Sequence, residues 1–207
     1  MVNFGSCEKK VWSQNGEDGV IAAIFALICT TSKFYVEFGA SGENNTALLR
    51  EQGWNGVWMD QGDCPPAHKE FITAENINDL LAKYQVPVEF DILSIDIDGN
   101  DYWVWKAIKH RPRVVVIEFN GYLDPAVPLT IKYNPNHQWN HDSYFGASVA
   151  ALQKLGKEKG YKLAYVDFNL VNLFFIREDI TNEDFYLYIR RRTDRIKHGE
   201  GQWHVVE

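Results

Sequence analysis

Acidic residues stand where apolar segments of this chain end, and they are the residues best placed to do chemistry. Glu37 ends one such segment, Asp60 ends the next, Asp96 and Asp98 follow a third, and Glu118 ends a fourth. Carboxylates gathered at one edge of a sheet repel one another unless hydrogen bonds or a cation offset their charge. Because open parallel sheets bind ligands beyond the carboxyl ends of their strands, the pattern predicts a site for a cation or a polyhydroxylated ligand there.

A glycine-containing loop follows the first of these segments, in the sequence VEFGASGENNT. Gly39 and Gly42 fit part of a G-x-G-x-x-G pattern, and glycines allow a backbone to approach a ligand closely. Glu37 is placed to accept hydrogen bonds or to balance a cation. Asp60 lies about twenty residues further on, where a carboxylate commonly binds ribose hydroxyls. The structural alternatives are a tight turn between a strand and its helix, and a loop or capping role for Asp60.

The segment DILSIDIDGNDYWVW is the second strong feature of the chain. Alternation along an extended strand puts Asp96 and Asp98 on one side. A glycine then permits a turn, after which Asn100 or Asp101 can cap a helix. Asp96 and Asp98 are therefore predicted catalytic residues, either as ligands of a divalent metal or as a general base with its orienting partner.

The segment VVVIEFNGY contributes two more oxygen-bearing side chains. Glu118 and Asn120 share a face of the strand, again with a period of two. Together with Asp96 they form a predicted set of ligands for a hard cation, Mg²⁺ or Mn²⁺. The alternative is that these groups hydrogen-bond a sugar or an amide without metal.

Two histidines in NPNHQWNHDSY are the candidates for a general base. His137 and His141 titrate near neutrality, and their loop is expected to lie over the strand ends. Either one could instead be an ordinary loop residue. Trp139, Tyr133 and Tyr144 could stack on the apolar face of a sugar ring or could pack the loop itself.

Apolar runs alternate with helical patterns, which is typical of an α/β fold with a mostly parallel central sheet. Only four residues separate the last two predicted strands, which should therefore pair as an antiparallel hairpin. We expect one domain, residues 1–207, with an N-terminal helical segment at 1–30 and a long irregular loop at 120–145 on the substrate side. The expected strands are 34–38, 56–60, 70–73, 90–96, 114–119, 162–167 and 172–177, and the expected helices lie near 18–29, 45–51, 77–83, 102–109, 147–160 and 183–195.

The amino-acid composition indicates a protein with a single globular domain. The chain has 207 residues, 45% of them hydrophobic, which suffices for one domain with a sizeable core. No apolar run is long enough to span a bilayer, and the N-terminus lacks a signal-peptide core, so we expect a cytoplasmic protein. The three cysteines lack the spacing of a disulfide framework or a zinc cluster.

Charge argues against one class of partner. A net charge of −7 disfavours binding to nucleic acid through phosphate contacts. A basic run lies near the C-terminus, at 190–197, and is predicted to be the solvated face of a helix, with contact to a partner or an anionic substrate as the alternative.

In sequence, the chain resembles the FkbM-like branch of S-adenosylmethionine-dependent methyltransferases. The resemblance covers residues 13 to about 176, and the order and spacing of its pieces are more specific than any one piece. The matching pieces are SQNGEDG, FYVEFGASGENNT, GWNGVWMD, SIDIDGND, VVVIEFN, YFGAS, KGYKL and VNLFFI. Two features depart from the pattern: the loop reads GASGE rather than a fuller G-x-G-x-G, and 60–68 is too short for a helix between the second and third strands.

The resemblance implies a Rossmann-like class I methyltransferase fold with seven strands, the last of them antiparallel, and helices on both faces. It implies that Glu37, Gly39 and Gly42 surround the methionine end of S-adenosyl-L-methionine, that Asp60 holds the ribose, and that Gln14 helps to close the site. The adenine is expected near Ile72, Thr73 and Glu75, and the expected cofactor site also includes Ala40, Asn45 and Asp96.

The implied activity is methylation of a sugar, glycan or natural-product hydroxyl, and the implied partner is a small-molecule or glycan acceptor. A metal at Asp96, Glu118 and Asn120 would be similar to that of catechol and sugar O-methyltransferases. Two other readings stay open. One is a non-catalytic nucleotide-binding module of the same fold, and the other is a metal-dependent nucleotide-sugar enzyme that uses Asp96 and Asp98 as a D-x-D pair.

Overall fold

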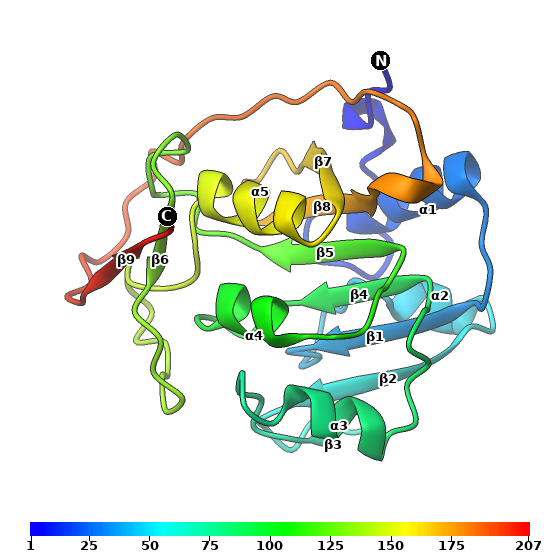
Figure 1. The fold of residues 1–207 in the computed structure, drawn as a ribbon, viewed down its shortest axis with the longest axis horizontal. Helices are drawn as coiled ribbons and strands as arrows, with labels where there is room; N and C mark the ends of the chain where they lie inside the picture. Colours follow the sequence, from blue (N-terminus) through cyan, green and yellow to red (C-terminus); the bar gives the residue numbers. More distant parts are fainter.

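A single mixed sheet organises the molecule, and the computed structural model describes all of its residues, 1–207 (Figure 1). Its strands are β1 (Phe34–Phe38), β2 (Asn55–Asp60), β3 (His68–Lys69), β4 (Ile92–Ile95), β5 (Val114–Glu118), β7 (Tyr161–Val166) and β8 (Asn172–Arg177). They are ordered β3–β2–β1–β4–β5–β8–β7, and β8 runs antiparallel to both of its neighbours. This arrangement is the Rossmann-like class I methyltransferase fold, so the expected fold class is confirmed.

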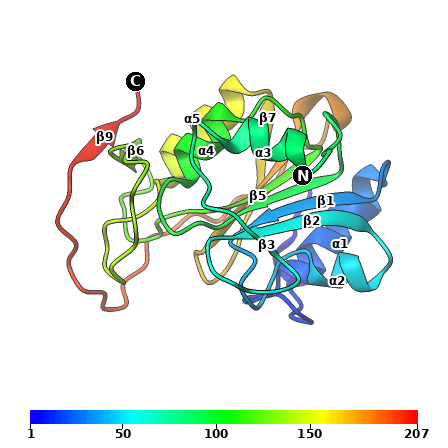
Figure 2. The same cartoon turned by 90° about the horizontal axis from the view of Figure 1, so that it is seen from below.

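Helices cover both faces of the sheet (Figure 2). They are α1 (Glu17–Ile28), α2 (Ala47–Glu51), α3 (Ile77–Lys83), α4 (Asp101–Ala107) and α5 (Val149–Glu158), and the short 3₁₀ turns are η1 (Gly5–Cys7) and η2 (Glu178–Ile180). Helices α1 and α2 lie on one face, and α3, α4 and α5 lie on the other. The central strands β4 and β5 are buried along their whole length, because helices cover both of their faces. None of the helices is long and apolar enough to cross a membrane.

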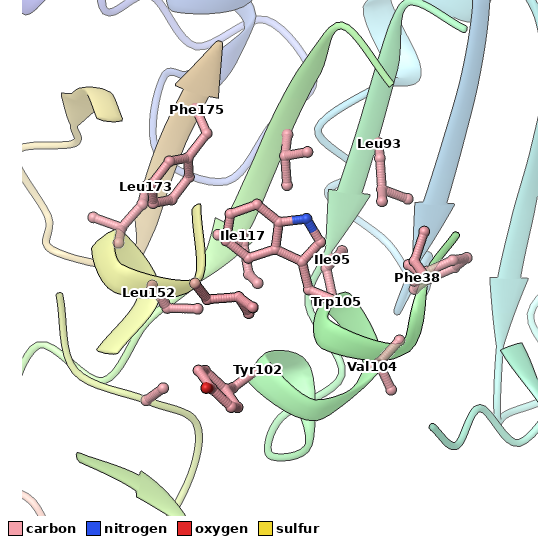
Figure 3. Close-up of a cluster of buried hydrophobic side chains, with 14 of the residues drawn as sticks. Phe38, Leu93, Ile95, Tyr102, Val104, Trp105, Ile117, Leu152, Leu173 and Phe175 are labelled. Atoms are coloured by element: carbon pink, nitrogen blue, oxygen red, sulfur yellow. The ribbon is translucent and has the colours of Figure 1, made fainter. Parts of the chain in front are cut away.

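The larger core lies between the sheet and helices α3 to α5 (Figure 3). Trp105 of α4 is 1% exposed, and its ring centroid lies 4.9 Å from that of Phe175 on β8. Gly156 of α5 lets the helix approach this pair, because a Cβ there would lie 2.8 Å from the Phe175 ring. The core therefore fixes α4, whose N-terminal end reaches the edge where the acidic strand ends gather.

Two expected elements are wrong. The third strand is His68–Lys69 rather than 70–73, since only two residues pair with β2 before the chain turns away. Residues 183–195 form no helix, so the basic residues of 190–197 are not a helix face. The other expected elements are present, with ends shifted by three residues at most.

The C-terminal segment instead runs extended around the molecule as a strap, residues 181–207 (orange to red in Figure 1). It first pairs with the N-terminus, where the Val2 N–H donates to the Asp184 carbonyl at 2.7 Å. It ends in β9 (Trp203–Val205), which pairs antiparallel with β6 (Leu129–Ile131). The expected irregular loop 120–145 thus contains a short strand, and the strap holds that strand in place.

Candidate functional site

The principal cavity opens at the carboxyl ends of β1, β2 and β4 and has a volume of about 350 Å³. This is the edge at which open α/β sheets bind ligands, and the volume is within the range of small-molecule sites. Its wall contains acidic residues but neither lysine nor arginine; the carboxylates are those of Glu37, Glu43, Asp60, Glu70, Asp96 and Asp98. Salt bridges to Lys10 and Lys83 offset the charges of Glu43 and Glu70.

Glu37 fixes the end of the glycine loop through hydrogen bonds. One carboxylate oxygen accepts the Asn45 N–H at 2.7 Å, and the other accepts the Thr46 N–H at 3.0 Å and the Thr46 hydroxyl at 2.5 Å. The Trp58 indole N–H in turn donates to the Thr46 hydroxyl oxygen at 2.7 Å. Burial raises the pKa of Glu37 to about 7, in spite of these donors. Glu37 therefore shapes the loop and also lines the cavity.

The two glycines of the loop have different reasons to be glycine. Gly39 has a φ of +78°, and a Cβ there would lie 1.6 Å from the Asp96 carbonyl oxygen, so β1 and β4 could not come together with any other residue. Gly42 has nothing within 4 Å of its Cβ position and lines the cavity. Its missing side chain leaves space that a ligand can fill.

Asp60, the residue expected to hold the ribose, and one of the residues expected near the adenine line the cavity. Asp60 is 8% exposed, lines the cavity and accepts the Gly62 N–H at 2.6 Å through one carboxylate oxygen. Ile72 lines the same wall, but Thr73 and Glu75 do not. Thr73 exchanges hydrogen bonds with Asn76 before α3, and Glu75 accepts a hydrogen bond from the Tyr133 hydroxyl. Only Ile72 of the three residues expected near adenine therefore reaches the cavity.

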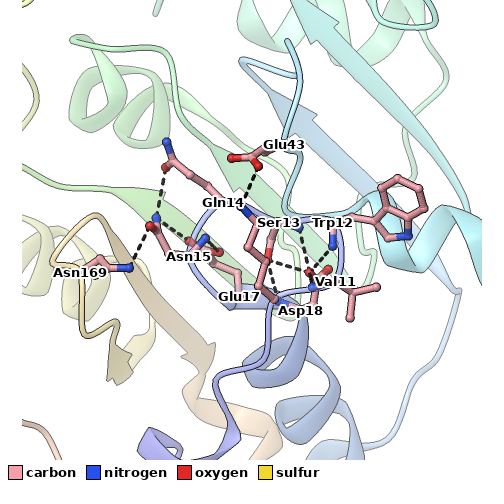
Figure 4. Close-up of polar contacts among 10 residues, drawn as sticks. Val11, Trp12, Ser13, Gln14, Asn15, Glu17, Asp18, Glu43 and Asn169 are labelled. Atoms are coloured by element: carbon pink, nitrogen blue, oxygen red, sulfur yellow. Dashed lines mark hydrogen bonds and ion pairs between the residues drawn. The ribbon is translucent and has the colours of Figure 1, made fainter.

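Hydrogen bonds to Asp18 tie the N-terminal segment together (Figure 4), and Gln14 of this segment lines the cavity. One oxygen of Asp18 accepts the backbone N–H groups of Val11, Trp12 and Ser13 and the Ser13 hydroxyl, each at 2.8 Å. These bonds fold residues 11–13 over the N-terminus of α1. Gln14 thereby lines the cavity, as do Asn45 and Gly39 of the remaining expected cofactor residues. Ala40 is buried and faces a separate, smaller pocket.

Three carboxylates gather beyond β4 and β5. Oxygens of Asp96, Asp98 and Glu118 all lie within 4.8 Å of one another. Burial, reinforced by neighbouring carboxylates, raises the pKa of Asp96 and of Glu118 well above the ordinary values. Burial also raises the pKa of Asp98, whose φ of 55° lies in the left-handed region. Oxygen Oε2 of Glu118 is buried without a hydrogen-bond partner in the protein, so a proton or a cation is needed to compensate the charge of the cluster.

Two further polar residues of this edge have structural roles. Asp101 accepts the N–H groups of Ile97 at 2.9 Å and Gly99 at 2.8 Å, and so fixes the turn before α4. The Asn120 amide donates to the carbonyls of Ser143 and Phe145, and its oxygen accepts the Tyr122 N–H. Asn120 therefore holds the irregular loop through these bonds, and the third carboxylate that converges with those of Asp96 and Glu118 is that of Asp98.

The irregular loop brings one histidine and one tryptophan to the cavity. His137 and Trp139 line it, whereas His141 is exposed and outside the lining. Burial lowers the pKa of His137, and its Nε2 is buried without a partner. The Trp139 ring lies 4.8 Å from the His141 ring, centroid to centroid. Tyr133 and Tyr144 pack within the loop and its surroundings, so only Trp139 of the three aromatic candidates lines the cavity.

Sequence reasoning missed several lining residues, of which Asn172 is the most instructive. Asn172 begins β8 and pairs in register with Glu118. Its Nδ2 donates to Glu17, which leaves its Oδ1 buried without a partner beside the cavity. The antiparallel direction of β8 brings its first residue to the same edge as the ends of the parallel strands. The antiparallel hairpin predicted from the sequence therefore already implies that Asn172 lies at this edge.

Comparisons with known proteins give structural matches alone. No model of a protein family matches the chain. No curated protein matches its sequence. Three methyltransferases are among the solved structures that it resembles. The sugar N-methyltransferase KedS8 from Streptoalloteichus sp ATCC 53650 matches at 10% identity and a TM-score of 0.47, over 78% of this chain and 86% of that one.

The 1,6-didemethyltoxoflavin-N1-methyltransferase of Burkholderia thailandensis, solved with S-adenosylhomocysteine, matches at 14% identity and a TM-score of 0.44, over 84% of each chain. An S-adenosylmethionine-dependent methyltransferase from Clostridium acetobutylicum ATCC 824 matches at 9% identity and a TM-score of 0.39, over 76% of this chain and 89% of that one. At such low identities, the function must be argued from the residues of the cavity.

Proposed function

We propose that the protein is an S-adenosylmethionine-dependent methyltransferase of the FkbM-like branch, which methylates a hydroxyl of a sugar, glycan or natural product. One observation carries the proposal. A single cavity at the carboxyl edge of the sheet joins the glycine loop, the strand-end carboxylate of Asp60 and the half-buried Asp96. Gly42 leaves space that the methionine part of the cofactor would fill, and Asp60, at the end of β2, would bind the ribose hydroxyls.

The charge of the cavity supports this cofactor over a phosphate-bearing one. Its wall offers six carboxylates and no lysine or arginine. Phosphate groups are bound by arginine, lysine or the N-terminus of a helix, and a pyrophosphate would meet negative charge here. S-adenosylmethionine has no phosphate and carries a positive sulfonium, which the unpaired aspartates at the strand ends stabilise.

The residues on the acceptor side have separate tasks in this proposal. The bound cofactor supplies a methyl group that is already activated for transfer. The protein must align the acceptor hydroxyl with it and accept a proton. His137 is the proposed base, because its Nε2 is free of protein partners and its lowered pKa keeps the ring neutral at pH 7. Asp96 and Asp98 orient the hydroxyl, and Trp139 offers a face to the ring of the acceptor.

A divalent ion, Mg²⁺ or Mn²⁺, completes the proposed acceptor site. The residues fit such an ion, because three carboxylate oxygens converge within 4.8 Å and Oε2 of Glu118 has no other partner. Asp96, Asp98 and Glu118 would hold it, and it would lower the pKa of an acceptor hydroxyl. We expect MgCl₂ to raise the melting temperature of the wild type but not of Glu118→Gln, with the exposed Glu51→Gln as control. Equal responses of the wild type and Glu118→Gln would remove the metal from the proposal.

Ligand stabilisation tests the cofactor. S-adenosylhomocysteine at a hundred times its Kd stabilises a native state by about 2.7 kcal/mol. For a chain of this length that corresponds to a rise in melting temperature of roughly 5–11 °C. We expect this rise with S-adenosylhomocysteine, none with NAD⁺, and none with UDP plus Mn²⁺ beyond that of Mn²⁺ without UDP. Additional stabilisation by UDP in the presence of Mn²⁺, without stabilisation by S-adenosylhomocysteine, would instead establish the nucleotide-sugar alternative. Binding of S-adenosylhomocysteine without methyl transfer would favour the non-catalytic one.

A further inference from the structure

The C-terminal strap is built into the wall that carries His137. The Arg192 N–H donates to the Gly121 carbonyl at 2.7 Å, and the Ser143 N–H donates to the Lys197 carbonyl at 2.9 Å. The strap ends with the ladder between β9 and β6, after which Val206 is 6% exposed. The irregular loop is thus held at its start, near its end and at its only strand by residues far away in sequence.

Tyr144 is the loop side chain that connects the strap to His137. Its hydroxyl donates to the Gln202 carbonyl at 2.7 Å, and its ring lies 5.1 Å from that of Trp203. Gly201 lies against the ring, because a Cβ there would come within 2.2 Å of Cζ of Tyr144. Gly199 lies against the backbone of the same residue, at 2.5 Å from its nitrogen by the same measure. The strap therefore fixes both the backbone and the ring of Tyr144.

The opposite side of Tyr144 faces His137. The two rings meet edge to face, with centroids 6.0 Å apart and planes at 70°. His137 in turn covers Gly99, where a Cβ would come within 2.2 Å of Cδ2 of the imidazole. Contacts therefore run from Gly201 through Tyr144 and His137 to Gly99, the residue that follows Asp98. Each end of this row is a glycine that has no room for a side chain.

From this row of contacts we infer that Tyr144 and Gly201 are positioning residues that hold the imidazole of His137 against the strand-end aspartates. The inference rests on the proposed function for the role of His137 as a base, but the placement itself is a property of the free protein. The ring of Tyr144 holds the imidazole of His137 by packing against it, and the Tyr144 hydroxyl anchors the strap. Removing the ring, or pushing it aside with a Cβ at position 201, should therefore displace His137.

The test uses the full chain without ligand. Proton–carbon NMR spectra resolve the imidazole signals, and the signal that disappears in His137→Gln is assigned to His137. We expect Gly201→Ala and Tyr144→Ala to shift or broaden this signal. We expect Tyr144→Phe, which keeps the ring, and Glu200→Ala, an exposed neighbour of Gly201, to leave it in place. Amide exchange of residues 134–140 should rise about tenfold or more in the first two variants, while α4 keeps its protection.

An unchanged His137 signal in Gly201→Ala would overturn the inference, as would an equal shift in Glu200→Ala. Gly201→Ala alone decides the matter if Tyr144→Ala does not fold. Titration of each variant with S-adenosylhomocysteine separates this inference from the proposed function. If the wild type does not bind the ligand, the proposed function fails while the NMR result stands. If binding is intact and His137 does not respond, the positioning inference fails alone.

Discussion

The two glycines of the loop give the sharpest pair of substitutions. Gly39→Ala puts a non-glycine residue at a φ of +78° and a Cβ 1.6 Å from the Asp96 carbonyl oxygen, where ordinary contact begins at 3.4 Å. The left-handed backbone costs about 1–2 kcal/mol, and overpacking of this kind costs about 1–3 kcal/mol. The free energy of unfolding should therefore fall by roughly 2–5 kcal/mol, which for a chain of this length lowers the melting temperature by about 4–20 °C.

Gly42→Ala is the matched control and should behave in the opposite way. Its Cβ meets nothing within 4 Å, so the free energy of unfolding should change by less than about 0.5 kcal/mol. Because Gly42 lines the cavity, we expect the new methyl to take space from the ligand, and the Kd for S-adenosylhomocysteine should rise at least about tenfold, or about 1.4 kcal/mol. Calorimetric melting and isothermal titration measure the two quantities. A Gly39→Ala protein as stable as the wild type would refute the packing argument, and unchanged affinity in Gly42→Ala would refute the placement of the ligand.

Three further predictions concern buried carboxylates. Burial raises the pKa of Asp167 to about 7, so the native state keeps a proton that the unfolded chain releases near pH 4, and stability should fall between about pH 4 and 7. Asp167→Asn should remove this residue's share of the fall, leaving that of the other buried carboxylates such as Glu37, and be more stable than the wild type at pH 8, by at most about 4 kcal/mol in urea titrations; a less stable variant would contradict the assignment. Asp18→Ala removes the oxygen that accepts four hydrogen bonds from residues 11–13. Amide exchange at these residues should therefore rise and S-adenosylhomocysteine should bind more weakly, and unchanged exchange would show that Asp18 does not hold the segment. Asp91→Ala leaves the guanidinium of Arg113 buried without its 2.9 Å partner and should cost about 3–5 kcal/mol in the same urea titration; a loss below 1 kcal/mol would show that the pair is dispensable.

The fold could be predicted from sequence because its central strands are apolar along their whole length. Strands β4 and β5 are buried at every position, and such runs leave little ambiguity. The sequence predicts a helix at 183–195, within the strap, because this segment is rich in helix-forming residues. Its burial in fact alternates, with Phe185, Leu187 and Ile189 partly buried and the residues between them exposed. This period of two was the available signal.

The site could be predicted only in part, for a related reason. Residues at the ends of strands, such as Asp60 and Asp96, are placed by the sheet, so the sequence locates them. Glu75, Asn120 and His141 lie in segments whose course depends on contacts between distant parts of the chain. The pairing of β6 with β9 joins three residues to three others over 70 positions away, and no local pattern specifies it. The placement of His137 depends on the same contacts.

The proposed cofactor site can be tested by isothermal titration with S-adenosylmethionine in the presence of EDTA. The titration compares the wild type with Asp60→Ala. We expect saturable binding of one molecule to the wild type and a loss of at least about tenfold in affinity, or about 1.4 kcal/mol, for Asp60→Ala. The variant should keep the melting temperature of the wild type within a few degrees, since Asp60 accepts only the Gly62 N–H from the protein. Absence of binding to the wild type, or equal binding to both proteins, would contradict the proposed cofactor site.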